Sequence, residues 1–382
     1  MNKCIVVSDS FKGTLSSMEI SYIAEQTIPE YFPECEVIPI PVGDGGEGTV
    51  DCMFAALSAE PVTLEVSGPY MEKVIATYAI KDDLAIIEMA AAAGLPLVGN
   101  RKNPSLTTTY GVGQMIEDAV MRGCRKIYLG LGGSATNDAG CGAAAALGVR
   151  FFNSDGKNFI PAGATLNDIS AIDVTSCREF LKDVKITAMC DVTNPLFGIN
   201  GAAYIFGPQK GADPKMVEML DVGLENLNNV IFNTLGVDLA YVPGSGAAGG
   251  FGGGVMAFMG GELISGIDAV LKLTDFDNLL ENCDLVITGE GRLDDQSFSG
   301  KVIDGITKRT LPKEIPVFAI VGIVGKLTED LSEHGISAVF ETNREHLPFE
   351  DVIPTAWEDY DRTLREAMQY QKVIERKASL IR

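Results

Sequence analysis

Acidic, basic and hydroxyl side chains gather in five glycine-rich segments of this 382-residue chain. The segments are SDSFKGT (8–14), GDGGEGT (43–49), GLGGSATNDAGCG (130–142), CDVTNPLFG (190–198) and TGEGRLDDQSFSGK (288–301). Each follows a run of apolar, often β-branched residues that is typical of a buried strand. In open parallel sheets, ligands bind beyond the carboxyl ends of the strands. Composition and position therefore both favour a ligand site at these segments.

The residue types in these segments match what the transfer of a phosphoryl group requires. Mg²⁺ needs one or two carboxylates, the phosphate oxygens need cations and backbone amides, and the acceptor hydroxyl needs a carboxylate nearby. The acids are Asp44, Glu47, Asp191, Glu290 and Asp294, and the cations are Lys12, Lys210, Arg292 and Lys301. The glycines of segment 130–142 precede a helical stretch and offer amides at its positive end. A general anion-binding site would have the same composition.

Each of these residues also has an ordinary structural explanation. An aspartate beside a glycine, such as Asp44 or Asp138, is commonly a helix cap or a turn former. Lys12 or Lys301 taken alone would more often be a solvated surface lysine. Five acid-bearing segments at strand ends are harder to explain as five unrelated turns, so together they favour a functional site.

Two familiar nucleotide-binding patterns are incomplete in this chain. The stretch PGSGAAGGFGGG (243–254) contains a literal GxGxxG but no acid, and a proline stands where the dinucleotide fingerprint needs a preceding strand. The Gly300–Lys301 pair lacks the upstream glycine of a P-loop and is followed by Val302 instead of Ser or Thr. The signatures of protein kinases are missing as well. A kinase with this sequence would therefore be neither a P-loop kinase nor a protein kinase.

The overall composition argues against several classes of partner and cofactor. The formal net charge of −22 gives no basic surface for nucleic acid or for an anionic membrane. With only two histidines, a histidine-rich metal site or a histidine-based triad is not expected. No apolar stretch approaches the length of a membrane span, and no secretion signal is recognisable. We therefore expect a cytoplasmic protein, and the oligomeric state stays open.

The elements that must position the five segments follow the pattern of a parallel α/β sheet at both ends of the chain. Strands are predicted over Cys4–Ser8, Val37–Val42, Leu285–Thr288, Val317–Val321 and Ala338–Glu341. A serine-rich helix start at 16–17 has Glu19 in its first turn. An amphipathic helix over about 354–377 closes the chain.

The middle of the chain follows a different pattern. Extended runs at 63–66, 74–80 and 85–89 are separated by short polar turns and predict an antiparallel meander. Helices are then predicted over 111–121, 140–147 and 217–232, and strands over 126–131 and 185–189. We therefore predict an α/β fold in which a Rossmann-like three-layer parallel-sheet domain (1–65 plus 280–382) is interrupted by an inserted α/β domain (66–279) with some antiparallel strands. The cleft between these domains is expected to hold the active site.

Taken as an ordered set, the motifs closely resemble those of the type I glycerate kinases. The motifs SDSFKGT, PVGDGGEGT, GLGGSATNDAG, CDVTNPL, FGPQKGA, GAAGGFG and ITGEGRLDDQSFSGK occur in the expected order, and the resemblance covers essentially the whole chain. One small departure is Ala139, which stands where a third motif glycine is common. The resemblance implies ATP-dependent phosphorylation of D-glycerate to 2-phosphoglycerate with Mg²⁺. It also implies a Rossmann-like domain with an inserted second domain, and a place in glyoxylate and glycerate metabolism.

The residues and the resemblance together suggest roles in a direct in-line transfer. The expected catalytic residues are Asp191, Arg292 and Lys12; the substrate-binding residues Asp44, Glu47, Ser10 and Gln296; the nucleotide-binding residues Gly132, Gly133, Ser134, Thr136, Asn137, Lys210 and Lys301; and the metal ligands Glu290 and Asp294. Asp191 is expected to accept the proton of the 2-hydroxyl, although its role and that of Asp294 could be exchanged. Arg292 or Lys12 is expected to pair with the glycerate carboxylate, for which a planar guanidinium is the better match.

Other functions stay open at this stage. The enzyme could make 3-phosphoglycerate or act on another small hydroxy acid, because regiochemistry depends on the placement of one hydroxyl. An NAD-linked dehydrogenase would use the GxGxxG in the stretch 243–254. A ligand-binding regulator without enzymatic activity is a third alternative, which no DNA-binding motif or basic surface supports.

Overall fold

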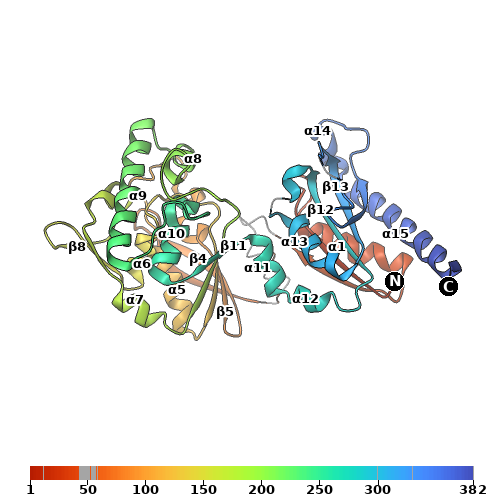
Figure 1. Cartoon of the computed structure of the whole chain (residues 1–382), viewed down its shortest axis with the longest axis horizontal. Coiled ribbons are helices and arrows are strands. Elements are labelled where there is room, and N and C mark those ends of the chain that lie inside the picture. The colour runs from red at the N-terminus through yellow and green to blue at the C-terminus, as the bar shows by residue number, and fades with distance from the viewer. Residues whose placement is uncertain are drawn as a thin grey trace. The chain divides into compact units, whose positions relative to one another are not determined.

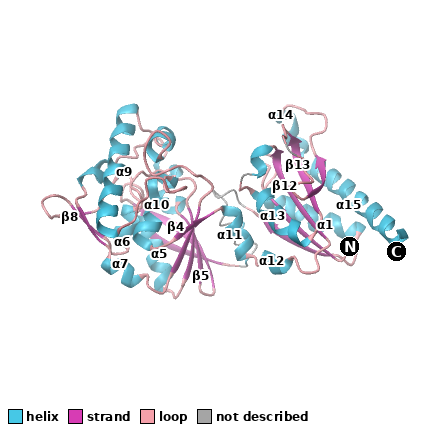
Figure 2. Cartoon of the chain, in the orientation of Figure 1, coloured by secondary structure: helices cyan, strands magenta, loops and turns pink. Residues whose placement is uncertain are grey.

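The chain folds into two compact units (Figure 1). The computed structural model describes residues 1–11, 13–42, 52, 57, 59–298, 300–328 and 330–381. Among these, unit 1 contains residues 1–42, 52, 57 and those from 267 onward, and unit 2 contains residues 59–266. In each unit the strands form a sheet that helices flank (Figure 2). This architecture confirms the predicted α/β fold with parallel strands and an antiparallel portion.

Unit 1 is built on a five-stranded sheet in which every neighbouring pair is parallel. The strand order is β14-β13-β12-β1-β2, with β14 at Ile336–Glu341, β13 at Val317–Val324, β12 at Leu285–Leu293, β1 at Lys3–Ser8 and β2 at Glu36–Pro41. Helices α1 (Ser17–Tyr31) and α15 (Ala356–Ile381) share one hydrophobic core with β1, β12 and β13. Helix α13 (Val302–Thr310) contributes Ile303 to a separate core with β12 and β13.

The remaining short helices of unit 1 are α11 (Gly266–Leu273), α12 (Phe276–Leu279) and α14 (Phe349–Val352). The start of α1 shows why the sequence forms a helix at that point. The Ser16 side chain accepts a hydrogen bond from the Glu19 amide at 3.2 Å, and the Ser16 amide donates to Glu19 Oε2 at 2.8 Å. This reciprocal capping box satisfies two amide groups that would otherwise lack partners, and it confirms the predicted helix start.

Unit 2 is built on a six-stranded mixed sheet. The strand order is β11-β10-β6-β5-β4-β3, with β11 at Glu262–Ile264, β10 at Lys185–Met189, β6 at Lys126–Gly130, β5 at Leu84–Glu88, β4 at Lys73–Lys81 and β3 at Glu60–Ser67. Strands β3, β4 and β5 form the predicted antiparallel meander. From β5 onward the pairing with β6, β10 and β11 is parallel, so the carboxyl ends of β6 and β10 lie at the same edge of the sheet.

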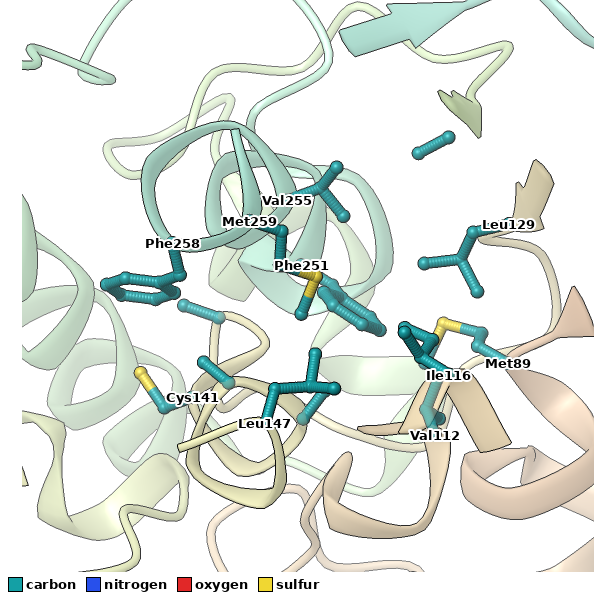
Figure 3. Packing of buried hydrophobic residues seen from close by; sticks show 14 of the residues in the cluster. Met89, Val112, Ile116, Leu129, Cys141, Leu147, Phe251, Val255, Phe258 and Met259 are labelled. Carbon is teal, nitrogen blue, oxygen red and sulfur yellow. The ribbon is translucent and has the colours of Figure 1, made fainter. Parts of the chain in front are cut away.

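Three helices share the hydrophobic core of unit 2 with its six-stranded sheet. They are α5 (Tyr110–Met121), α6 (Cys141–Ala146) and α10 (Ala247–Met259), and Val112 of α5, Leu129 of β6 and Phe251 of α10 lie in this core (Figure 3). The close approach of α5 to α6 needs glycine: a β-carbon on Gly113 of α5 would lie 2.3 Å from the Ala143 carbonyl oxygen of α6.

The other elements of unit 2 lie around this core. They are α3 (Ala90–Ala93), α4 (Leu95–Val98), α7 (Thr175–Phe180), α8 (Ala202–Phe206), α9 (Pro214–Leu235) and a small antiparallel sheet of β7 (Arg150–Phe152), β8 (Asn158–Phe159) and β9 (Ala171–Asp173). None of the helices within the described residues is both long enough and apolar enough to cross a membrane.

Two glycine-rich segments differ from the expected loops. Strand β12 continues past Thr288, because β13 runs beside it and pairs Glu290 with Val321 and Arg292 with Ile323. Glu290 and Arg292 therefore lie on a strand and not in a loop. The stretch 243–254 forms most of α10, which Ala248, Gly249 and Gly250 interrupt with positive φ angles of 54°, 69° and 92°. Sequence patterns for strands and helices carry no signal for such a left-handed turn.

Candidate active site

The segment between β6 and α6 is the most enclosed of the polar segments in unit 2. Its residues Thr136, Asn137 and Asp138 are completely buried, whereas Gly133 is exposed. A buried polar side chain requires a partner, since leaving one unpaired costs about 1–3 kcal/mol. The contacts of this segment therefore show which groups the protein itself satisfies and which it leaves for a ligand.

Asp138 holds the segment from within. Its Oδ2 accepts hydrogen bonds from the amide and hydroxyl of Thr109, both at 2.8 Å, and from the Gly142 amide at 3.1 Å. Thr108 Oγ1 lies 3.4 Å from the same oxygen, and the Gly140 amide donates to Oδ1 at 3.2 Å. Burial raises the pKa of Asp138, and the hydrogen bonds from Thr109, Gly142 and Gly140 oppose that rise. Both carboxylate oxygens are thus engaged inside the protein.

Lys210 holds the same segment from another element. It ends a single 3₁₀ turn, η2 (Pro208–Lys210), and its Nζ donates to Ser134 Oγ at 2.6 Å and to the Thr136 carbonyl at 2.7 Å. The side chain is fully buried, and this burial lowers its pKa to about 7 while the charge of Asp138 acts in the opposite direction. The structure thus brings together Ser134, Thr136 and Lys210, three residues predicted from sequence to bind the nucleotide.

The left-handed turn of α10 packs against the same segment. The Ala139 amide donates to the Gly249 carbonyl at 3.0 Å, and a β-carbon on Gly249 would lie 2.1 Å from the Thr136 carbonyl oxygen. Ala139 has a φ angle of 51°, in the left-handed region that favours glycine. This explains physically why a glycine suits the position at which the chain has alanine.

Several polar atoms around this turn lack partners. Within the described part of the chain, Thr136 Oγ1, both side-chain polar atoms of Asn137 and Ser245 Oγ are buried without a hydrogen bond. Ordered water or the polar atoms of a ligand would satisfy them. Thr136 Oγ1, Asn137 Nδ2 and Ser245 Oγ in this group are donors of the kind that an oxyanion requires.

Asp191 occupies a different environment in the same unit. It lies two residues after the end of β10, is exposed, and its Oδ1 accepts a hydrogen bond from the Gly266 amide at 2.8 Å. This bond orients the carboxylate without removing it from solvent. A carboxylate in this position can accept a proton from a bound hydroxyl.

The candidate residues of unit 1 gather near Glu290. Glu290 is 8% exposed, and its Oε1 has no hydrogen-bond partner among the residues that the structure describes. Burial raises its pKa; a hydrogen bond from Ser297 and the charge of Lys301 oppose this, and the charges of Asp9 and Asp294 add to it. Three carboxylates and one lysine therefore share this region, which has an excess of negative charge.

The other predicted residues of unit 1 lie in the segments that meet at β12. The Asp9 amide donates to the Gly289 carbonyl at 2.9 Å, and the Ser10 amide donates to Asp9 Oδ1 at 2.7 Å. Arg292 Nε lies 3.7 Å from Asp294 Oδ2, and the Gln296 amide donates to Asp294 Oδ1 at 3.0 Å. Unit 1 thus brings Ser10, Arg292, Asp294, Gln296 and Lys301 into the neighbourhood of Glu290.

These carboxylates fit a magnesium ion of the kind found in kinases. Among the described residues there is no cluster of three or more histidine, cysteine or acidic side chains that could hold a metal. Mg²⁺ at a phosphoryl-transfer site is commonly bound by only one or two carboxylates, with waters and substrate phosphates completing its shell. The unpartnered Oε1 of Glu290 would supply one such oxygen and Asp294 a second.

Not every candidate residue is described by the structure, and some residues of the site were not predicted from the sequence. Lys12, Asp44 and Glu47 lie outside the described residues. The support that Thr109 gives to Asp138 and the buried Ser245 were not predicted. A run of three threonines (107–109) ahead of a helix was the available signal, but nothing in the sequence linked it to a segment about thirty residues away.

Comparisons with known proteins agree with these motifs. Residues 4–372 match the model of a family described as "Glycerate kinase family". A glycerate kinase of Bacillus cereus is 43% identical over 98% of this chain and 99% of its own length. A glycerate 2-kinase of Escherichia coli is 44% identical over 88% of this chain and 90% of its own length. A crystal structure of a candidate glycerate kinase 2 from Salmonella typhimurium has a TM-score of 0.86 at 38% identity, and the match covers 98% of this chain and 99% of that one.

Proposed function

The chain belongs to the glycerate kinase family and is a kinase, and we propose that it transfers the γ-phosphoryl group of ATP to D-glycerate with Mg²⁺. We propose 2-phosphoglycerate as the product because the similar Escherichia coli protein is named a glycerate 2-kinase. The observation that carries the mechanism is Glu290, a buried carboxylate with one unpartnered oxygen in a region of excess negative charge.

Unit 1 contains the carboxylates to which we assign the metal. Glu290 and Asp294 would hold Mg²⁺, which would supply positive charge beside the phosphate oxygens. Lys301, at the N-cap of α13, attracts the same phosphate groups. Arg292, whose side chain is 67% exposed, is available to pair with the glycerate carboxylate. Ser10 and Gln296 bind the substrate beside it.

Unit 2 contains the donors to which we assign the phosphate groups. The amides of Gly132 and Gly133 and the side chains of Ser134, Thr136 and Asn137 bind phosphate oxygens, and Lys210 holds this group through its hydrogen bonds to Ser134 and Thr136. The unpartnered Thr136 Oγ1 and Asn137 side chain support this assignment. Preorganised donors of this kind stabilise charge in the transition state without having to reorient during the reaction.

Asp191 is the proposed general base. Its carboxylate is exposed, and the Gly266 amide fixes one of its oxygens. In the proposed reaction it accepts the proton of the glycerate 2-hydroxyl as that oxygen attacks the γ-phosphorus. Lys12, Asp44 and Glu47 complete the proposed set of substrate-binding and catalytic residues.

The test of this function is the identity of the product. The protein is incubated with ATP, MgCl₂ and D-glycerate, and the phosphorylated product is identified by ³¹P NMR. Formation of 2-phosphoglycerate supports the proposal, whereas 3-phosphoglycerate or turnover of only another hydroxy acid contradicts it. Thermal unfolding gives a second measurement, because a ligand that binds only the folded state raises Tm. We expect MgATP to raise Tm, and a rise with NAD alone would favour a dehydrogenase.

A further inference from the structure

Two oppositely charged and fully buried side chains hold the segment between β6 and α6. Asp138 belongs to the segment itself, and Lys210 reaches it from η2. We propose that Asp138 and Lys210 are a pair of positioning residues, which act on the phosphate groups through Thr136 and Asn137. This inference rests on the proposed function, because it takes the segment to be the phosphate-binding part of a kinase.

The hydrogen bonds of Asp138 leave neither of its oxygens free to contact a substrate. Its two oxygens are engaged by donors from residues 108–109, 140 and 142, whereas Thr136 Oγ1 and the Asn137 side chain have no partner among the described residues. Thr109 is itself fixed, because its Oγ1 also accepts a hydrogen bond from the Ala143 amide at 2.9 Å. Asp138 therefore connects the start of α5, the turn before α6 and α6 itself at one point.

The contacts of Lys210 are made to the opposite side of the same segment. Two of its three ammonium protons go to Ser134 Oγ and the Thr136 carbonyl, which are uncharged acceptors. Within the described part of the chain, no carboxylate lies within ion-pair distance of Lys210, and Asp138 is the only charged group that acts on it. An ammonium buried without a direct counter-ion is unfavourable for stability alone. Its position is better explained by the two hydrogen bonds with which it holds Ser134 and Thr136 in place.

The backbone and the side chains of residues 135–137, which lie between the contacts of Asp138 and Lys210, differ in their hydrogen bonding. The Ala135 carbonyl accepts a hydrogen bond from Thr107 Oγ1 at 2.8 Å, and the Thr136 carbonyl accepts one from Lys210. The backbone is thus held, while Thr136 Oγ1 and the Asn137 side chain have no partner among the described residues. A fixed backbone with unused side-chain donors is the arrangement that a preorganised anion site requires.

A double-mutant cycle tests the pair. We compare Asp138→Asn, Lys210→Met and the double variant in the full chain at pH 6, below the Lys210 pKa of about 7, with MgATP and D-glycerate varied separately. Each single variant is expected to lower kcat/KM for MgATP about 30-fold, while KM for D-glycerate changes less than about 2-fold. Because each single variant leaves one buried charge unbalanced, we expect the double variant to lose at least about 5-fold less than the product of the single losses.

A milder pair of variants covers the case in which the charge variants do not fold. Thr109→Val removes one donor to Asp138, and Thr109→Ser restores the hydroxyl. We expect Thr109→Val to raise KM for MgATP about 5-fold and Thr109→Ser to return it to the wild-type value. Thr63→Val is the matched control, because Thr63 shares its hydrogen bond only with Thr77 on the exposed face of β3 and β4.

Several results would overturn the inference. Losses that fall equally on both substrates together with a lower Tm would show a purely structural role. Single losses that multiply in the double variant would show that the two residues do not act as a pair. Failure of the wild-type protein to phosphorylate D-glycerate would count against the proposed function instead. In that case, the cycle is measured as the rise in Tm with MgATP, and equal rises in all variants would still refute the positioning role.

Discussion

The polar segment that follows β6 and the one at the end of β12 are organised in opposite ways. In unit 2, the segment from 131 to 142 is almost wholly buried. Thr107 and Lys210 donate hydrogen bonds to its backbone, and Thr109 donates to the Asp138 side chain. In unit 1, the end of β12 holds Glu290 with one unpartnered oxygen, and Arg292 projects into solvent with 67% of its side chain exposed. The unit 2 segment has its backbone held while the side chains of Thr136 and Asn137 lack partners, whereas the unit 1 segment has an unpartnered carboxylate oxygen.

This difference suits the two segments to ligands of opposite charge. Folding alone orders the donors of unit 2, so little reorganisation remains when phosphate binds. The carboxylates of unit 1 repel one another, and the charges of Asp9 and Asp294 add to the rise that burial causes in the pKa of Glu290. A bound cation would remove that repulsion. Substitutions of the unit 1 carboxylates should therefore change kcat more than the free energy of unfolding. Substitutions of the residues that hold the unit 2 segment should change both quantities.

The largest effect is expected for Glu290→Gln. The amide keeps the shape of the side chain but removes the charge that Mg²⁺ requires, so we expect kcat to fall about 10³-fold. Tm should stay the same or rise, because the buried charge is lost together with its repulsion from Asp9 and Asp294. Steady-state kinetics and thermal unfolding measure the two quantities. Glu281→Gln, at an exposed position before β12, is the matched control.

A much lower Tm for Glu290→Gln together with an unchanged kcat would reverse the comparison. It would mean that unit 1, and not unit 2, depends on its buried polar group for stability. The carboxylate would then be a structural residue, and the proposed metal site would have to be sought elsewhere.

The next effect, on stability, is expected for Gly249→Ala in unit 2. The new β-carbon would lie 2.1 Å from the Thr136 carbonyl oxygen, and the backbone has a φ angle of 69°. We expect a loss of about 3 kcal/mol in the free energy of unfolding, measured by urea denaturation. Gly236→Ala is the matched control, since Gly236 has a φ angle of 72° but open space around it. Its loss should be about 1 kcal/mol, the part due to backbone conformation alone.

Equal losses in the two glycine variants would show that the unit 2 segment can move away from α10. The contrast between a rigid and an adaptable segment would then be wrong. A larger loss in Gly249→Ala would confirm that close packing against the left-handed turn fixes Thr136.

The sequence predicted the elements of this fold better than the contacts within the site. Apolar runs mark β1, β10 and β13 because buried strands need such residues whatever their neighbours are. The capping box of α1 involves residues three positions apart, so it too can be read locally. The hydrogen bond from Lys210 to Ser134 spans 76 positions, and nothing local to either residue indicates it. The exposed position of Asp191 and the buried one of Asp138 likewise depend on how distant segments pack.

A smaller effect, on chemistry alone, is expected for Asp191→Asn. If Asp191 is the general base, kcat should fall about 10²-fold, with little change in either KM. Tm should not fall, because Asp191 is exposed and the amide oxygen of asparagine can still accept the bond from Gly266. A raised KM for D-glycerate with unchanged kcat would instead assign Asp191 to substrate binding. This result would place all the chemistry in unit 1 and sharpen the contrast between the units.

The smallest effect concerns the pH dependence of stability in Lys210→Met. Burial lowers the pKa of Lys210 from an ordinary value of 10.5 to about 7. Between these values, the unfolded chain carries a proton on Lys210 that the folded chain lacks, so rising pH disfavours unfolding. Relative to Lys210→Met, the wild-type protein should gain about 1 kcal/mol of stability per pH unit above pH 7, and the difference should be constant below about pH 6.

Urea denaturation of both proteins at pH 6, 7.5 and 9 measures that difference. Groups such as the cysteines titrate in both proteins and cancel, which leaves the contribution of the single buried ammonium. A difference that stays constant up to pH 9 would mean that Lys210 keeps its charge throughout, because the attraction of Asp138 and the two hydrogen bonds fully offset its burial. The unit 2 segment would then be held by a permanent charge, and its phosphate affinity should show no dependence on the ionisation of Lys210 across that range.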